Sequence, residues 1–312
     1  MARPEATRTS WRDDLGELLL RVAATGLVPA RLFLRSVPSP DELPGRTGPL
    51  HIEIVSHCWK YDHLLAYQLS SLVNHPPAGV TIRMTVFHSP EDRGTVALLD
   101  YFGNMTVPGV EWNWQALDRG HLFRRAIGRN RAALATEADW IWFTDCDVVF
   151  HDGCLDALGE ALQGRRDRLV FPREERVTPL LSEDAPTLRA TAGGLRLVEI
   201  DPAQFSVRTS SQAKGPLQIT HGDVARACGY CNSLALYQKP ANRWRKATED
   251  RAFRWLLRTQ GVPLEIPGVH RIRHAAKGRY RPEAATSRIR GLLRRLQSWL
   301  QELRHGGGGP DA

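Results

Sequence analysis

The sequence predicts an α/β protein built on a mostly parallel sheet flanked by helices. From about residue 50 onward, short apolar runs of strand type alternate with segments that repeat apolar residues at helical spacing. That alternation is typical of βαβ units and a parallel sheet. The chain of 312 residues, 42% of them hydrophobic, is long enough to fill one large core or two smaller ones.

We expect the chain before residue 49 to form an N-terminal extension of the main domain. Residues 9–35 repeat Leu and Val at helical spacing and predict one or two helices. Residues 37–49 are rich in Pro and Gly and predict a linker. We therefore expect an N-terminal helical extension and linker over 1–48 and a main domain over 49–280.

The main domain divides into a regular part and a looser part. In the regular part we expect strands at 51–56, 81–87, 109–114 and 140–144, and helices at 62–73, 95–102 and 119–135. In the looser part we expect helices at 155–162 and 248–259, a strand at 169–172, and a strand and loop over 264–274. Residues 173–230 have no clear periodicity, which is typical of functional loops or small antiparallel structure.

The apolar runs, the first residues and the cysteine count indicate in which cell compartment the protein works. No run approaches the roughly 18 apolar residues that span a bilayer, and the first residues lack the apolar core of a signal peptide. The five cysteines are an odd number, which argues against a disulfide framework. We expect a cytoplasmic protein in which the CxxC of Cys228 and Cys231 consists of structural thiols.

The basic character belongs to the C-terminal extension, residues 281–312, and the residues just before it. Residues 271–304 hold ten Lys or Arg and two Glu, which accounts for the whole net charge of +8. Residues 287–304 predict a basic amphipathic helix with Leu and Trp on one stripe. Two interpretations stay open: the helix lies on an anionic membrane surface, or it packs on the body and exposes its arginines. No nucleic-acid-binding fold accompanies the basic residues, so nucleic acid is not an expected partner.

The stretch WIWFTDCDVVF, residues 140–150, ends a buried strand with two acids. On an extended chain Asp145 and Asp147 would project to the same side, because side chains alternate with a period of two. Two neighbouring carboxylates attract a cation, and Mg²⁺ or Mn²⁺ often binds one or two carboxylates together with substrate phosphates. The plainer alternative is that the acids only solvate the strand end.

The stretch from Gly120 to Phe150 resembles family-2 glycosyltransferases with the GT-A fold, on the matches Arg129, Asn130, Asp145 and Asp147. The resemblance spans roughly residues 50–280. It implies a nucleotide-binding half over 49–152 and an acceptor half over 153–280. It also implies a nucleotide-diphospho sugar, linked to UDP or GDP, as donor and Mn²⁺ or Mg²⁺ as cofactor.

The resemblance places the nucleotide on two parts of the first half. It implies that Ser56, His57 and Cys58, after the first strand, contact the base and ribose. It implies that Arg129 meets the diphosphate, for which a guanidinium is well shaped; the alternative is a solvated helix arginine. The sequence departs from the family at Phe87 and His88, which stand where an acid is expected, and this leaves the nucleotide undetermined.

The resemblance also assigns residues in the second half. Asp250 becomes the general base that takes the proton of the acceptor hydroxyl, with Glu249 orienting the acceptor or the base; read from spacing alone, both acids stabilise a helix N-terminus. For the late histidine of the family, His274 is favoured over His270 as a metal or phosphate ligand. The acceptor-side loop matches at Gly229, Asn232 and Ser233.

Together these matches predict a metal-dependent, inverting glycosyltransferase with a glycan or lipid-linked acceptor, working on the inner face of the cell membrane or nearby. Two alternatives remain. One is a degenerate GT-A scaffold that binds partners or membrane without turnover. The other is a phosphatase of the haloacid-dehalogenase type, whose DxD also follows a hydrophobic strand, although there the motif comes at the first strand.

Overall fold

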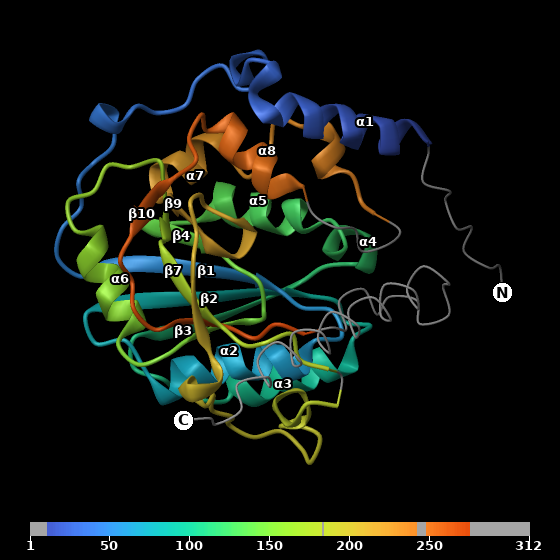
Figure 1. The fold of residues 1–312 in the computed structure, drawn as a ribbon, viewed down its shortest axis with the longest axis vertical. Coiled ribbons are helices and arrows are strands. Elements are labelled where there is room, and N and C mark those ends of the chain that lie inside the picture. Colours follow the sequence, from blue (N-terminus) through green and yellow to red (C-terminus); the bar gives the residue numbers. More distant parts are fainter. Residues whose placement is uncertain (1–10, 183, 242–247, 275–312) are drawn as a thin grey trace, which may run out of the picture.

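The computed structural model describes residues 11–182, 184–241 and 248–274. The expected tail helix at 287–304 and the whole extension 281–312 lie outside the described residues, and so does the start of the N-terminal extension. The described chain forms a seven-stranded sheet and a four-stranded sheet, with helices around them (Figure 1).

The seven-stranded main sheet has the order β10-β6-β9-β4-β1-β2-β3. Its central strand β1 pairs in parallel with β2 on one side and with β4 on the other. β9 is the antiparallel member, placed between β4 and β6. The predicted class, a mostly parallel sheet flanked by helices, is confirmed. The strands of this sheet are β1 (Leu50–His57), β2 (Val80–His88), β3 (Val110–Ala116), β4 (Trp140–Phe143), β6 (Leu169–Pro172), β9 (Gln218–His221) and β10 (Val262–Leu264).

Helices cover the main sheet on both sides. Figure 1 shows α5, α7 and α8 above the strands and α2 and α3 below them. Every residue of β4 is buried and all but one of β1 are buried, as expected of strands covered on both faces. The helices are α1 (Trp11–Val22), α2 (Asp62–Asn74), α3 (Arg93–Gly103), α4 (Arg119–Leu122), α5 (Arg125–Ala135), α6 (Cys154–Leu162), α7 (Gly222–Cys228) and α8 (Glu249–Leu256).

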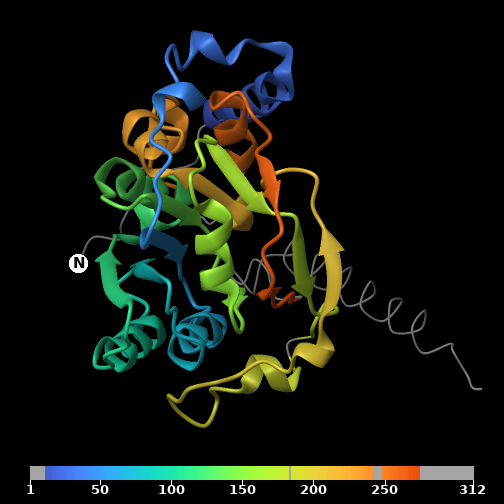
Figure 2. The same cartoon turned by 90° about the vertical axis from the view of Figure 1, so that its left-hand side faces the viewer.

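The small sheet has the order β5-β11-β7-β8. Figure 2 shows its strands beside the main sheet. Two of its strands come from the segment without clear periodicity, which folds into short strands, turns and α7. The small sheet consists of β5 (Val148–Phe150), β7 (Glu174–Val177), β8 (Ser206–Thr209) and β11 (Val269–Arg271).

The helix expected over 119–135 is two helices, α4 and α5. Asp118 caps the first by accepting a hydrogen bond from the backbone N–H of His121 at 3.1 Å. The break falls at Arg124, whose backbone is not helical (φ −104°, ψ 84°). Its guanidinium contacts Glu17 of α1 at 2.7 Å and donates to the carbonyl of Lys239. These long-range contacts stabilise the break and hold the N-terminal extension against the body.

Helix α1 carries an apolar stripe that faces outward. Leu15, Leu18, Leu19 and Val22 share one face of the helix, and all four are exposed. Within the part of the chain that the structure describes, no helix is both long and apolar enough to cross a membrane. The stripe is therefore a surface feature of the N-terminal extension.

Candidate active site

The DxD acids lie on a turn between β4 and β5. The strand ends at Phe143, and the backbone N–H of Val148 donates to the carbonyl of Asp145 at 3.1 Å. The buried side chain of Gln68, on α2, donates to the same carbonyl at 3.0 Å. The expectation of an extended chain through Asp145 and Asp147 is therefore wrong, because a turn and a side chain occupy the groups that a longer ladder would use.

The Asp145 carboxylate faces two arginines of α5. Its Oδ1 lies 2.5 Å from Nη1 of Arg125 and 3.2 Å from Nη2 of Arg129. Burial acts to lower the pKa of Arg125, but the carboxylates of Asp145 and Glu249 outweigh it and the pKa is raised. Arg125 thus lies between two carboxylates, and its guanidinium group is of the type that binds phosphate oxygens.

Arg129 is buried, with 2% of its side chain exposed. Its Nη1 donates to the hydroxyl of Tyr230 at 2.9 Å, and its Nη2 donates to the carbonyl of Thr144 at 3.0 Å. The alternative of a solvated helix arginine is therefore excluded. Arg129 joins the end of β4 to the segment after α7.

Asn130 connects α5 to the predicted acceptor-side loop. Its Oδ1 accepts from the backbone N–H of Tyr230 at 2.9 Å, and its Nδ2 donates to Oδ1 of Asn232 at 3.0 Å. Gly229 has a φ of +63°, and a Cβ there would lie 2.3 Å from Asn130 Oδ1. Only glycine fits this approach without strain. Ser233 is exposed at the end of the same loop.

The two acids of α8 differ in their surroundings. Glu249 is buried, and within the described residues its Oε2 has no hydrogen-bond partner. Asp250 has 28% of its side chain exposed and lies 3.6 Å from Nη1 of Arg254. Gln218 of β9 connects this helix to the arginine cluster, because it accepts from the Tyr230 hydroxyl and donates to the Asp250 carbonyl.

Ser56, His57 and Cys58, predicted to contact the nucleotide, are all buried. His57 stacks on Phe87 with 5.0 Å between ring centroids. Its pKa is held well below 6.5 by burial and by the charges of Arg129 and Arg125. A Cβ at Gly128 would lie 2.2 Å from His57 Nε2, so this glycine lets α5 approach the ring. In this structure His57 is buried against α5, and direct nucleotide contact stays a prediction.

The structure separates the two histidines between which the sequence left a choice. The backbone N–H of Ile272 donates to the carbonyl of Asp147 at 2.9 Å, so His274, two residues on, follows β11 at the DxD end. His270 pairs instead with Val149 in the antiparallel ladder of β11 and β5. Burial lowers the pKa of His270. The placement favours His274 as the residue near the acids.

Asp145, Asp147 and His274 have donor groups of the type that binds a divalent cation, although among the described residues the ligand atoms of these three do not all lie within 4.8 Å of one another. Asp147 is 4% exposed and His274 is 3% exposed, and Asp145 lies on the same turn as Asp147. Carboxylate oxygens are the ligands that Mg²⁺ and Mn²⁺ prefer. Substrate phosphate oxygens would complete the coordination shell.

Four residues of this site were not singled out from the sequence: Arg125, Tyr230, Gln218 and Gln68. Arg125 precedes Arg129 by four positions, so helical spacing alone places it on the same face. Tyr230 lies inside the predicted acceptor-side loop. Gln68 and Gln218 act through contacts with carbonyls and a hydroxyl far away in the chain, for which the sequence carries no local signal.

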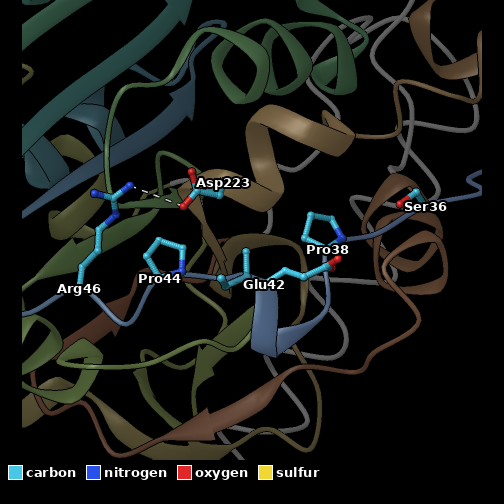
Figure 3. A pocket seen from close by; sticks show the side chains of 7 residues that line it. Ser36, Pro38, Glu42, Pro44, Arg46 and Asp223 are labelled. Carbon is cyan, nitrogen blue, oxygen red and sulfur yellow. Dashed lines mark ion pairs between the residues drawn. The ribbon is translucent and has the colours of Figure 1, made fainter.

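A surface hollow lies away from this cluster. It is lined by Ser36, Pro38, Glu42, Leu43, Pro44, Arg46 and Asp223, and Figure 3 shows Arg46 reaching toward Asp223. Arg46 also pairs with Asp139, just before β4, which places the hollow at the amino end of that strand. Ligands of such sheets bind at the carboxyl ends of the strands, where the cluster around Asp145 lies.

No protein-family model and no curated protein matches the chain. Among solved structures, the chain is similar to TarS 1-349 from S. aureus, with 11% identity and a TM-score of 0.42, over 73% of this chain and 58% of that one. The same TarS fragment in complex with UDP-GlcNAc gives a TM-score of 0.41 at 11% identity, over 73% of this chain and 56% of that one. The mannosyltransferase PcManGT from Pyrobaculum calidifontis, in complex with GDP-Man and Mn²⁺, gives 0.42 at 14% identity, over 96% of this chain and 77% of that one.

The chain thus spans less than two thirds of the TarS fragment. Likenesses at these identities and TM-scores do not identify a function.

Proposed function

We propose that the protein is a glycosyltransferase with a GT-A-type fold that takes a nucleotide-diphospho sugar as donor. One observation carries the proposal. Arg129 makes hydrogen bonds to Thr144 and Tyr230 and an ion pair with Asp145, and so joins the DxD turn, the helix of Arg129 and Asn130 and the acceptor-side loop at one point. These are the motifs on which the sequence resemblance rests.

The donor diphosphate would lie against the arginine cluster. Arg125, with 18% of its side chain exposed, would offer its guanidinium group to the phosphate oxygens, while the buried Arg129 holds Asp145 beside it. Asp147, Asp145 and His274 would hold the divalent cation, which, when bound, neutralises the charge that develops on the leaving diphosphate. The stacked pair of His57 and Phe87 would support α5, the helix that carries the two arginines, from beneath.

The acids of α8 would act on the acceptor. Asp250 is accessible to an acceptor hydroxyl, whereas Glu249 is buried on the side of Arg125. We assign Asp250 as the general base and Glu249 as the residue that orients it. The hydroxyl oxygen attacks the anomeric carbon, its proton passes to Asp250, and the nucleoside diphosphate leaves from the opposite face, which inverts the configuration.

The experiment that tests this assignment measures release of UDP or GDP from a panel of nucleotide sugars in the presence of Mn²⁺. Asp250→Asn is expected to slow the release by about 100- to 10,000-fold, the usual contribution of a general base. Glu265→Gln, an exposed acid in the same half, serves as the matched control and keeps the wild-type rate. Release by Asp250→Asn at the control rate would show that Asp250 is not the base.

We further propose a lipid-linked or envelope glycan as acceptor, reached from the membrane surface. The outward apolar stripe of α1, with Leu18 56% exposed and Leu19 60% exposed, supports this proposal. Replacing both leucines by Gln should reduce cosedimentation with anionic liposomes by at least several-fold. If sedimentation is unchanged, the stripe is not a membrane contact.

A further inference from the structure

A second group of metal-ligating side chains lies at the other end of β5 from the DxD turn. His75 follows the last residue of α2, His151 follows β5, and Glu199 belongs to the loop that precedes β8. One ligand atom from each residue lies within 4.8 Å of the other two. Three segments remote in sequence therefore bring two imidazoles and a carboxylate together.

The distances suit a tetrahedral ion. Nε2 of His75 lies 3.2 Å from Oε2 of Glu199. Zinc ligands at about 2.0–2.1 Å from the metal lie roughly 3.3 Å from one another in a tetrahedron. This pair already has that separation. The rings of His75 and His151 are 4.6 Å apart between centroids, so a second imidazole lies beside this pair.

Hydrogen bonds hold the carboxylate in position. Asn74 donates from Nδ2 to Oε2 of Glu199 at 2.8 Å and to the carbonyl of Val198 at 3.3 Å. The hydroxyl of Ser70 accepts from the backbone N–H of Val198 at 3.0 Å. The loop that carries Glu199 is thus tied to α2, the helix that His75 follows. Such outer contacts are typical of metal sites, where they orient the ligands.

A third histidine gives independent support. His270 is 3% exposed and packs against His151, with 5.3 Å between ring centroids. Its Nδ1 donates to the carbonyl of Gly268, which leaves Nε2 as an acceptor, and within the described residues that Nε2 has no hydrogen-bond partner. Histidines that bind metals usually donate one ring N–H to a carbonyl or carboxylate and use the other nitrogen as the ligand.

The same Gly268 carbonyl also accepts from the backbone N–H of His151 at 2.8 Å. One peptide group therefore fixes the two histidines relative to each other. An ordinary surface ion pair between His75 and Glu199 would account for two of the four side chains. It would not account for the second and third imidazoles beside that pair, one of which is buried with an unpaired nitrogen.

We propose that His75, His151 and Glu199 form a binding site for a divalent transition-metal ion of the zinc class, with His270 packed against His151. Imidazole nitrogens with one carboxylate favour Zn²⁺, Co²⁺ or Ni²⁺ over Mg²⁺. The bound ion would connect α2, the segment after β5 and the loop before β8. The site is chemically distinct from the carboxylate turn at Asp147 and does not depend on the proposed transferase function.

The test is titration of the full chain, freed of metal and without a histidine tag, with Zn²⁺ by calorimetry and with Co²⁺ by visible absorption. An excess of Mg²⁺ is present so that it occupies the carboxylates of the DxD turn during the titration. The expected result is one equivalent of Zn²⁺ and a tetrahedral Co²⁺ spectrum. His75→Ala and His151→Ala should each weaken Zn²⁺ binding by at least 10-fold.

The matched control is His121→Ala, which removes another half-buried histidine paired with an acid, Asp118. It should bind Zn²⁺ as the wild type does. Circular dichroism of each variant without metal shows that it is folded. A wild type that takes up no Zn²⁺, or cluster variants that bind it as tightly as His121→Ala, would overturn the proposal.

Discussion

The two ends of β5 carry two different kinds of chemistry. Before the strand, Asp145 and Asp147 present carboxylates, and two arginines of α5 lie against Asp145. After the strand, His151 gathers with His75 and Glu199. Only the three residues Val148–Phe150 separate the two groups in the chain.

The side chains at each end of β5 indicate which kind of ion that end binds. Carboxylates beside guanidinium groups suit an anion that is bridged by a hard cation, as in a nucleoside diphosphate with Mn²⁺ or Mg²⁺. Imidazoles with one carboxylate suit a borderline cation that is held by the protein alone. We therefore infer a substrate site at one end and a structural metal site at the other.

A reciprocal pair of variants tests whether the two ends of β5 are separate metal sites. Asp147→Asn should abolish Mn²⁺ binding measured by electron paramagnetic resonance and leave Zn²⁺ binding unchanged. His151→Ala should do the reverse. If either variant affected both ions equally, the two ends would not be separate sites.

Arg129→Lys tests whether the carboxylate end depends on the guanidinium shape. Lysine keeps the charge but cannot contact Thr144, Asp145 and Tyr230 together. Nucleotide affinity should fall by about 10- to 100-fold, because hydrogen bonds to a buried charge contribute roughly 1.5–3 kcal/mol. Arg131→Lys, an exposed position on the same helix, is the control and should bind as the wild type does.

Gly229→Ala tests the connection between α5 and the acceptor-side loop. A Cβ there would meet Asn130 and would force a positive φ on alanine. We expect a loss of about 1–3 kcal/mol in the free energy of unfolding, measured by denaturant titration. Gly193→Ala, where nothing lies within 4 Å of the added Cβ, should change the stability little. Equal stability of the two variants would contradict the proposed close contact.

The pH dependence of stability sharpens the account of His57. Its folded pKa is held well below 6.5, so below that pH the unfolded chain binds a proton that the folded chain does not. The stability is therefore fully present above about pH 6.5 and is lost as the pH falls below it, by up to about 1.4 kcal/mol per pH unit. His57→Phe should reduce this slope between pH 7 and 5, while His121→Gln should keep it. An unchanged slope in His57→Phe would mean that His57 is not the titrating group.

Much of the main sheet could be predicted, because β1, β2 and β4 and helices α2 and α3 each have local periodicity or an apolar run of their own. The strand β9 could not, since its four residues QITH are buried by neighbours from remote parts of the chain. The division of the long helix at Arg124 was equally hidden. It depends on contacts with Glu17 and Lys239, and no Gly or Pro marks the break.

The site shows the same division. The motifs around Arg129, Asp145 and Asp250 could be singled out because each is a short local pattern that resembles the family. The turn at Asp145, the burial of His57 and the roles of Gln68 and Tyr230 depend on hydrogen bonds across the fold. The histidine group was invisible for the same reason, since its members lie 76 and 48 positions apart in the chain.

The most direct test of the carboxylate end is a calorimetric titration of the protein with UDP, GDP and their sugar conjugates, with Mn²⁺ and with a chelator. We expect one nucleotide class to bind only when the metal is present, and Asp147→Asn to lose that binding. The titration would also identify the preferred nucleotide, which the sequence leaves undetermined because Phe87 and His88 stand where the family has an acid. A folded protein that binds no nucleotide under either condition would contradict a donor site at the turn of Asp145 and Asp147.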